Sequence, residues 1–222
     1  MKLVFLLLVS FAALAAARTD MERALDRQDR AALEKLAVEA SKKTDAASQY
    51  QAALAYSYLA QAAMEAGDKA ASKTAAETGM GFARKAVEAK GDNAEYRRIL
   101  GTLCGQVIPA NVLAGMKHGR CAMDEVNKAV ELAPKSSIAW VSHGVGNYYL
   151  PAAFGGGVDK AILDFEKAAQ LDPKSAEAHL WLGIALRKAG KNADARKALE
   201  KSLQLNPERA WAKQQWEKTP AK

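Results

Sequence analysis

Residues 140–207 contain the same arrangement of small, apolar and proline residues twice, and this internal repeat constrains the fold more than any other feature. The first copy has Trp140, Gly144, Ala161, Phe165 and Pro173, and the second has His179, Leu182, Gly183, Ala195, Leu199 and Pro207. Ala161 to Ala195, Phe165 to Leu199 and Pro173 to Pro207 are each 34 positions, whereas Trp140 to His179 and Gly144 to Gly183 are each 39. The first copy therefore carries five additional residues between Gly144 and Ala161.

A period of about 34 residues, with small residues in two helices and proline after the second, is typical of stacked helix pairs. Small residues let two antiparallel helix backbones approach closely, and proline ends the second helix because it has no N–H to donate. The two copies resemble the tetratricopeptide repeat superfamily, in its exported bacterial form. The resemblance implies an all-α fold, a right-handed solenoid of antiparallel helix pairs. Abundant alanine and a 26% charged fraction also favour helices.

The first 17 residues have the pattern of an export signal. Lys2 gives a positive start, an apolar run covers residues 3–14, and three alanines precede Arg18. An uncleaved anchor is the alternative, but about 15 apolar residues are fewer than the roughly 20 that cross a bilayer. We expect an exported protein, periplasmic or secreted, with no stable membrane span after cleavage. The net charge of +7 is spread along the chain, so nucleic acid is not an expected partner.

The repeat pattern divides the remainder into six segments. They are an N-terminal capping helix or half-repeat (18–45), four repeats (46–92, 93–135, 136–175 with an insertion, and 176–207), and a C-terminal capping helix and tail (208–222). In the insertion, Leu150 precedes a proline, which predicts that one helix ends there and the next starts at Val158 or Asp159. The three glycines at 155–157 suit a sharp turn, or a binding lip formed with the flanking Tyr149 and Phe154.

Few residues suggest chemistry. His118, His143 and His179 lack metal-ligand spacing, and the last two occupy repeat-packing positions. No catalytic triad or paired-carboxylate motif stands out, so we expect no enzyme, cofactor or metal. Cys104 and Cys121 lie on paired helices, and an oxidising compartment would favour a disulfide between them; the alternative is two buried thiols.

In tetratricopeptide stacks the first helix of each pair lines a concave groove. By resemblance, the residues facing it would be Leu54, Ser57, Gln61, Met64, Glu95, Arg98, Thr102, Gln106, Ile138, Val141, Val145, Tyr148, Tyr149, Leu180, Ile184, Arg187 and Lys188. Peptide-binding members clamp a terminal carboxylate with lysine, asparagine and arginine. Here Thr102, Val145 and Ile184 replace the asparagines, so we expect no such clamp.

The leading functional hypothesis is a non-catalytic exported scaffold that binds another protein or peptide through this groove. The alternative is a periplasmic carrier for a hydrophobic small ligand, because the C-terminal half of the groove is apolar. Residues 149–157 resemble exported repeat proteins associated with TRAP transporters, although the lipid-anchor cysteine common in those relatives is absent. A second copy of the chain is another possible occupant. The alternative to ligand binding is that the N-terminal helix, the insertion or the C-terminal helix folds over the groove.

Overall fold

The computed structural model describes residues 20–108 and 112–221, and the predicted export signal lies outside them. Within these ranges the chain is helical and has no strand, as predicted. A helical segment at 20–26 precedes α2 (Arg30–Ala40), α3 (Ala46–Glu65), α4 (Lys69–Ala89), α5 (Ala94–Val107), α6 (Val112–Leu132), α7 (Ser137–Tyr149), the short 3₁₀ helix η2 (Ala152–Phe154), α8 (Val158–Leu171), α9 (Ala176–Lys188), α10 (Asn192–Leu205) and α11 (Ala210–Glu217). None of the described helices is long and apolar enough to cross a membrane.

Short polar residues fix where many of these helices start. Asp45 accepts a hydrogen bond from the backbone N–H of Ser48, and Asn93 accepts from those of Glu95 and Tyr96. These bonds satisfy N–H groups that have no partner inside the helix. The repeating starts therefore come from local sequence and need no tertiary contact.

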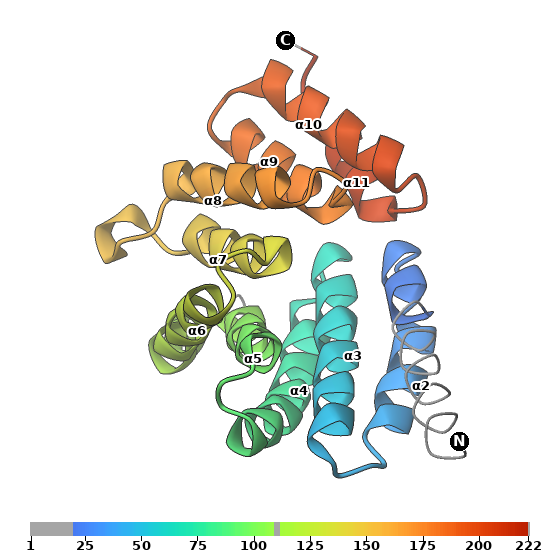
Figure 1. The fold of residues 1–222 in the computed structure, drawn as a ribbon. Coiled ribbons are helices and arrows are strands. Elements are labelled where there is room, and N and C mark those ends of the chain that lie inside the picture. The colour runs from blue at the N-terminus through green and yellow to red at the C-terminus, as the bar shows by residue number, and fades with distance from the viewer. Residues whose placement is uncertain (1–19, 109–111, 222) are drawn as a thin grey trace, which may run out of the picture.

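Consecutive helices pack in pairs. The first helices of the pairs also contact one another, α3 with α5, α5 with α7 and α7 with α9, and so form an inner row (Figure 1). The predicted small residues sit at the pair contacts. A Cβ added to Gly144 would lie 2.6 Å from the ring of Phe165, and one added to Gly183 would lie 2.5 Å from the side chain of Leu199. Such distances leave no room for a larger residue, so glycine sets the spacing inside each pair.

The insertion has the predicted helix boundaries. α7 ends at Tyr149, Leu150 is extended, and α8 begins at Val158. Between them the 3₁₀ helix projects from the side of the stack (Figure 1). The prediction followed from Pro151, which disfavours helical geometry in the residue before it.

Two large hydrophobic clusters and a smaller third one fill the stack. The first lies between α2 and α6 and includes Leu54, Ile99 and Leu103; the second lies between α7 and α11 and includes Phe165 and Leu199. The third lies at the N-terminal end and includes Leu25 and Leu33. Cys104 and Cys121 join α5 to α6 through a disulfide, with their Cα atoms 6.0 Å apart. The disulfide is therefore within a helix pair and adjoins the first cluster.

The stack curves until its last helix meets its first ones (Figure 1). Arg209, directly before α11, donates to Glu65 at the end of α3 (Nη1 to Oε2, 3.0 Å), and its Nε lies 3.6 Å from Glu177 and 3.8 Å from Asp26. The side chains of Arg209 and Glu65 are each only 2% exposed. We call these four residues the Arg209 cluster. Nearby, Arg27 pairs with Glu208 across the same junction at 3.0 Å.

Candidate functional site

The predicted groove residues lie on the inner row, but much of this row is packed against protein. Of the twelve central candidates, Arg98, Val141, Leu180 and Ile184 are buried; Thr102, Gln106, Ile138, Val145, Tyr148 and Arg187 are half-buried; Tyr149 and Lys188 are exposed. Leu54 and Ser57 of the first repeat are also buried. These buried positions are therefore not accessible to a ligand in this structure. The accessible part lies near the C-terminal ends of α7 and α9.

The cationic candidates already have partners within the chain. Arg98 binds Glu95 through Nε at 3.0 Å and Nη2 at 2.9 Å. Arg187 donates to the backbone carbonyl and side chain of Gln215 on α11, at 3.0 and 2.6 Å. Lys188 donates to the carbonyl oxygen of Tyr148 at 3.1 Å. A ligand that needed these charges would have to replace existing bonds.

The C-terminal helix covers part of the inner row, which is one of the covers expected from the sequence. Besides the Arg187 contacts, Trp211 of α11 packs against Trp181 of α9, with ring centroids 5.2 Å apart. Trp181 also meets Tyr148 at 6.0 Å and Tyr149 at 6.4 Å. These four rings, Tyr148, Tyr149, Trp181 and Trp211, form what we call the aromatic cluster.

Tyr149 is the accessible member of the aromatic cluster. Its side chain is exposed, with a relative accessibility of 58%. Nevertheless, desolvation by the surrounding protein, followed by the neighbouring Tyr148, raises the pKa of Tyr149 to about 12. The ring of Tyr149 packs edge-on against Tyr148 and Trp181, so the aromatic cluster presents an accessible aromatic surface at Tyr149.

The histidines do not assemble into a metal site, and no group of metal-ligating residues occurs in the described part of the chain. His118 is buried, and burial together with Lys117 lowers its pKa. His143 does pack against the ring of Trp140, at 5.7 Å, but it also bonds to Asp164 through Nδ1 at 2.8 Å. Sequence reasoning missed this polar contact because the two residues belong to different helices.

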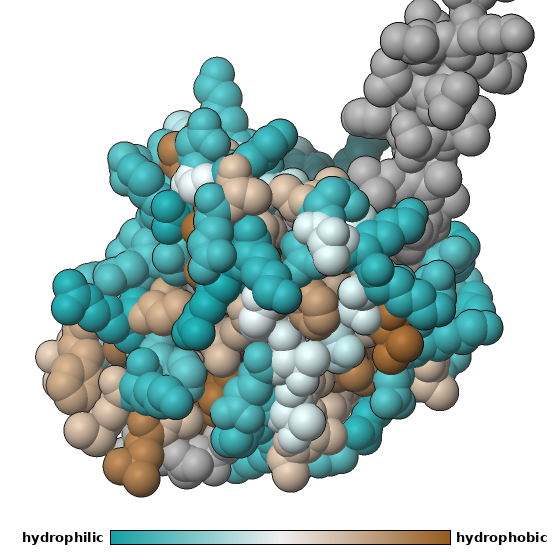
Figure 2. Space-filling view, turned by 90° about the horizontal axis from the view of Figure 1, so that it is seen from below, coloured by the Kyte–Doolittle hydropathy of each residue, from teal (hydrophilic) through white to brown (hydrophobic). Residues whose placement is uncertain are grey.

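Figure 2 shows one face of the molecule from below. Polar residues dominate there, and the apolar areas are small and separate. That face is typical of a solvated surface. Besides the aromatic cluster, hollows lie beside His143 and between α10 and α11, where Leu203, Pro207 and Trp216 help to line a volume of about 500 Å³.

Residues 156–216 match the sequence model of the tetratricopeptide repeat family. The C-terminal part of the chain is therefore similar in sequence to tetratricopeptide repeats. Tetratricopeptide repeat domains bind other proteins or peptides and are typically non-catalytic scaffolds. The similarity to this family agrees with the stacked helix pairs and with the packing of His143 against Trp140.

Three similar proteins illustrate the extent of the likeness. Small glutamine-rich tetratricopeptide repeat-containing protein 2 of Mycosarcoma maydis is 31% identical over 99 residues, which cover 44% of this chain and 26% of that protein. The match thus spans about a quarter of the relative's length. A thermophilic tetratricopeptide repeat protein of Thermus thermophilus has a TM-score of 0.57 at 16% identity, covering 88% of this chain and 91% of that one. The haemophore HusA of Porphyromonas gingivalis has a TM-score of 0.58 at 19% identity, covering 74% and 92%. Both structural likenesses concern the fold.

Proposed function

We propose that this chain is an exported tetratricopeptide scaffold that holds a partner protein at the aromatic cluster. The observation that carries the proposal is Tyr149, an exposed tyrosine whose ring packs against Tyr148 and Trp181. Tyrosine and tryptophan are enriched among the residues that dominate binding energy, because they bury a large area with few rotatable bonds. A partner would place an apolar side chain against this aromatic surface.

The position of Lys188 supports a partner segment with a negative or polar end. Its Nζ lies 4.0 Å from the ring centroid of Tyr148, so the cation and the aromatic surface share one site. Lys188 is exposed, and an ammonium has three protons, so its bond to the Tyr148 carbonyl leaves donors for a ligand.

The export half of the proposal is supported by the signal-like pattern of residues 1–17.

The test is capture of a partner from an extract of the source cell envelope, followed by binding measurements with the purified partner. We expect Tyr149→Ala to weaken the complex by about tenfold or more, the loss typical of a central aromatic contact. Leu163→Ala is the matched control, since Leu163 is an exposed apolar residue on α8, 65% accessible and outside the aromatic cluster. Equal affinities for the wild type and Tyr149→Ala, with a partner in hand, would refute the site.

The carrier hypothesis stays a second prediction. HusA is named a haemophore, and its fold is similar, but at 19% identity the likeness extends only to the fold. The aromatic surface at Tyr149 is the feature that would contact a hydrophobic ligand. Native mass spectrometry of freshly purified protein separates the two functions: a co-purifying small mass supports a carrier, whereas protein without added mass that still binds its partner supports the scaffold.

A further inference from the structure

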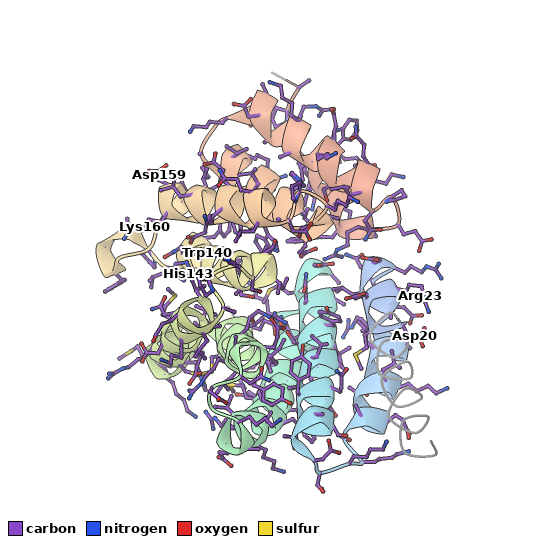
Figure 3. All side chains as sticks on the ribbon, viewed as in Figure 1. Asp20, Arg23, Trp140, His143, Asp159 and Lys160 are labelled. Atoms are coloured by element: carbon purple, nitrogen blue, oxygen red, sulfur yellow. A yellow bond between two sulfur atoms is a disulfide. The ribbon has the colours of Figure 1, made fainter. Side chains whose placement is uncertain are left out.

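A hollow separate from the aromatic cluster lies where the insertion leaves the stack. We call it the lateral cleft. It has a volume of about 360 Å³ and is lined by residues of α6, α7, the insertion and α8: Met123, Asn127, His143, Asn147, Leu150, Phe154, Gly155 and Lys160. Figure 3 shows His143 on α7 and Lys160 at the start of α8, on the side where the insertion projects.

The floor of the cleft is a hydrogen-bonded polar trio. Asp164, which is 7% exposed, accepts a bond from Asn147 Nδ2 at 2.7 Å and lies 2.8 Å from His143 Nδ1. Both lining side chains are therefore held in one orientation by a carboxylate behind them. In binding sites, buried hydrogen-bond partners of this kind hold the side chains that contact the ligand in place.

The packing of the repeat does not require this trio. In the next repeat, equivalent residues lie 39 positions later in the first helix and 34 positions later in the second. The residues equivalent to the trio are apolar: Leu182 for His143, Leu186 for Asn147 and Ala198 for Asp164. Burying polar groups costs free energy that an apolar set does not. The repeat formed by α7 and α8 therefore has three mutually bonded polar residues beside an open cleft, where the next repeat has three apolar packing residues.

The wall formed by the insertion is rigid. The N–H of Gly157 donates to the carbonyl of Asn147 at 2.9 Å, and Lys160 Nζ donates to the carbonyl of Gly155 at 2.7 Å. Gly157 has φ +116°, a conformation that other residues rarely adopt. On this fixed support Phe154 is 76% exposed, an unusual position for a large apolar ring.

The charge of the lining residues identifies the kind of ligand. Lys160 is the permanently charged residue among those that line the cleft, the floor carboxylate of Asp164 is already bonded to Asn147, and Asp159 lies above α8 in the view of Figure 3. At about 30 Å³ for each water-sized group, 360 Å³ holds roughly 12 non-hydrogen atoms. We propose that the lateral cleft binds a carboxylate joined to a short apolar group, with the carboxylate at Lys160 and the apolar part against Phe154 and Leu150.

N-acetyl-leucine is a suitable probe because it has about twelve non-hydrogen atoms, one carboxylate and one branched apolar group. N-acetyl-leucine amide is the matched compound without the charge. We expect N-acetyl-leucine to shift the backbone amide NMR signals of His143, Asn147, Gly155 and Lys160, with a dissociation constant in the millimolar range. The amide compound should bind about two- to fivefold more weakly or not measurably, as expected for loss of an exposed ion pair.

Two exposed substitutions test the site without disturbing the core. Lys160→Gln and Phe154→Ala should each weaken N-acetyl-leucine binding by about two- to tenfold, whereas Lys167→Gln, elsewhere on α8, should not. A triple variant, His143→Leu, Asn147→Leu and Asp164→Ala, copies the next repeat and should fold but lose binding. Equal binding of the two compounds, shifts elsewhere in the protein, or no effect of Lys160→Gln would overturn the proposal.

The same carboxylate chemistry occurs in free organic acids and at the C-terminus of a protein chain. Peptides of increasing length that end in leucine distinguish these sources. Affinity that rises with length identifies a protein C-terminus, and affinity that stays constant identifies a small acid. Both results presuppose that N-acetyl-leucine shifts the NMR signals of the cleft residues. If it does not, the proposed carboxylate site is contradicted, whichever source the carboxylate has.

Discussion

Replacing Arg209 by methionine is expected to destabilise the fold strongly, because it leaves a buried carboxylate without its cation. Arg209 and its main partner Glu65 are both almost completely buried. In Arg209→Met the carboxylate of Glu65 keeps only neutral donors, Gln28 at 2.9 Å and Gln61 at 3.0 Å. Removing one member of a buried ion pair typically costs about 3–5 kcal/mol, because the other charge stays buried without compensation.

For a chain of this size, about 3–5 kcal/mol corresponds to a fall in melting temperature of roughly 6–20 °C. Urea unfolding followed by circular dichroism measures the free energy directly. The control is Arg27→Met, which breaks the pair with Glu208 at the same junction, where both side chains are more than half exposed. An exposed pair contributes about 0–1 kcal/mol, so this variant should stay close to the wild type.

A double variant separates the lost pair from lost packing. Arg209→Met with Glu65→Leu removes both charges, and it should recover most of the stability because neither partner is left unpaired. Burial raises the pKa of Glu65 more than the hydrogen bond and charge of Arg209 lower it. Protonation of Glu65 therefore favours the folded state, and stability of the wild type at this site decreases as pH rises through that raised pKa. Equal unfolding free energies for Arg209→Met and Arg27→Met would refute the reasoning.

Three further predictions concern local features. Asp45→Ala should lower the free energy of unfolding by about 1 kcal/mol, the usual value of a helix cap. Hydrogen bonds from the Ser48 hydroxyl and N–H lower the pKa of Asp45 below its ordinary 3.8. The difference in unfolding free energy between wild type and variant should therefore be complete above that value and vanish as pH falls below the lowered pKa. Urea titrations at several pH values measure this. Replacing Cys104 and Cys121 by alanine should cost about 3 kcal/mol by releasing a loop of 17 positions, and thiol labelling of unfolded wild type should find no free thiol. Intact mass spectrometry of protein from the source cells should show a chain that begins at Arg18; a retained N-terminus would refute the export signal.

Features set by neighbouring residues could be predicted from the sequence. Pro151 placed the end of α7, and Gly144 marked a close helix contact. Each depends on backbone geometry or on one hydrogen bond within a few positions. The period of the repeat then indicated which helices pair, because equal spacing puts equivalent residues at equivalent contacts.

Features set by the curvature of the whole stack could not be predicted. Arg209 and Glu65 are 144 positions apart, and small rotations at each repeat decide whether they meet. Arg98 and Leu180 are also buried, although the family pattern alone would place them on an open groove. The polar trio around Asp164 did leave a signal, because comparison with the next repeat shows an apolar set in its place.

Closure of the stack also limits how a partner can bind. In the closed form a long helix cannot lie along the full inner row, because Gln61 of α3 already bonds to Glu177 of α9 at 3.3 Å. A partner that needs the whole row must first open the Arg209 cluster, and each ~1.4 kcal/mol spent on opening weakens its apparent affinity about tenfold. Arg209→Met should therefore tighten the binding of such a partner and leave unchanged the binding of one that contacts only Tyr149. Affinities of one purified partner for the two proteins decide between these modes, and weaker binding to a folded Arg209→Met protein would contradict both.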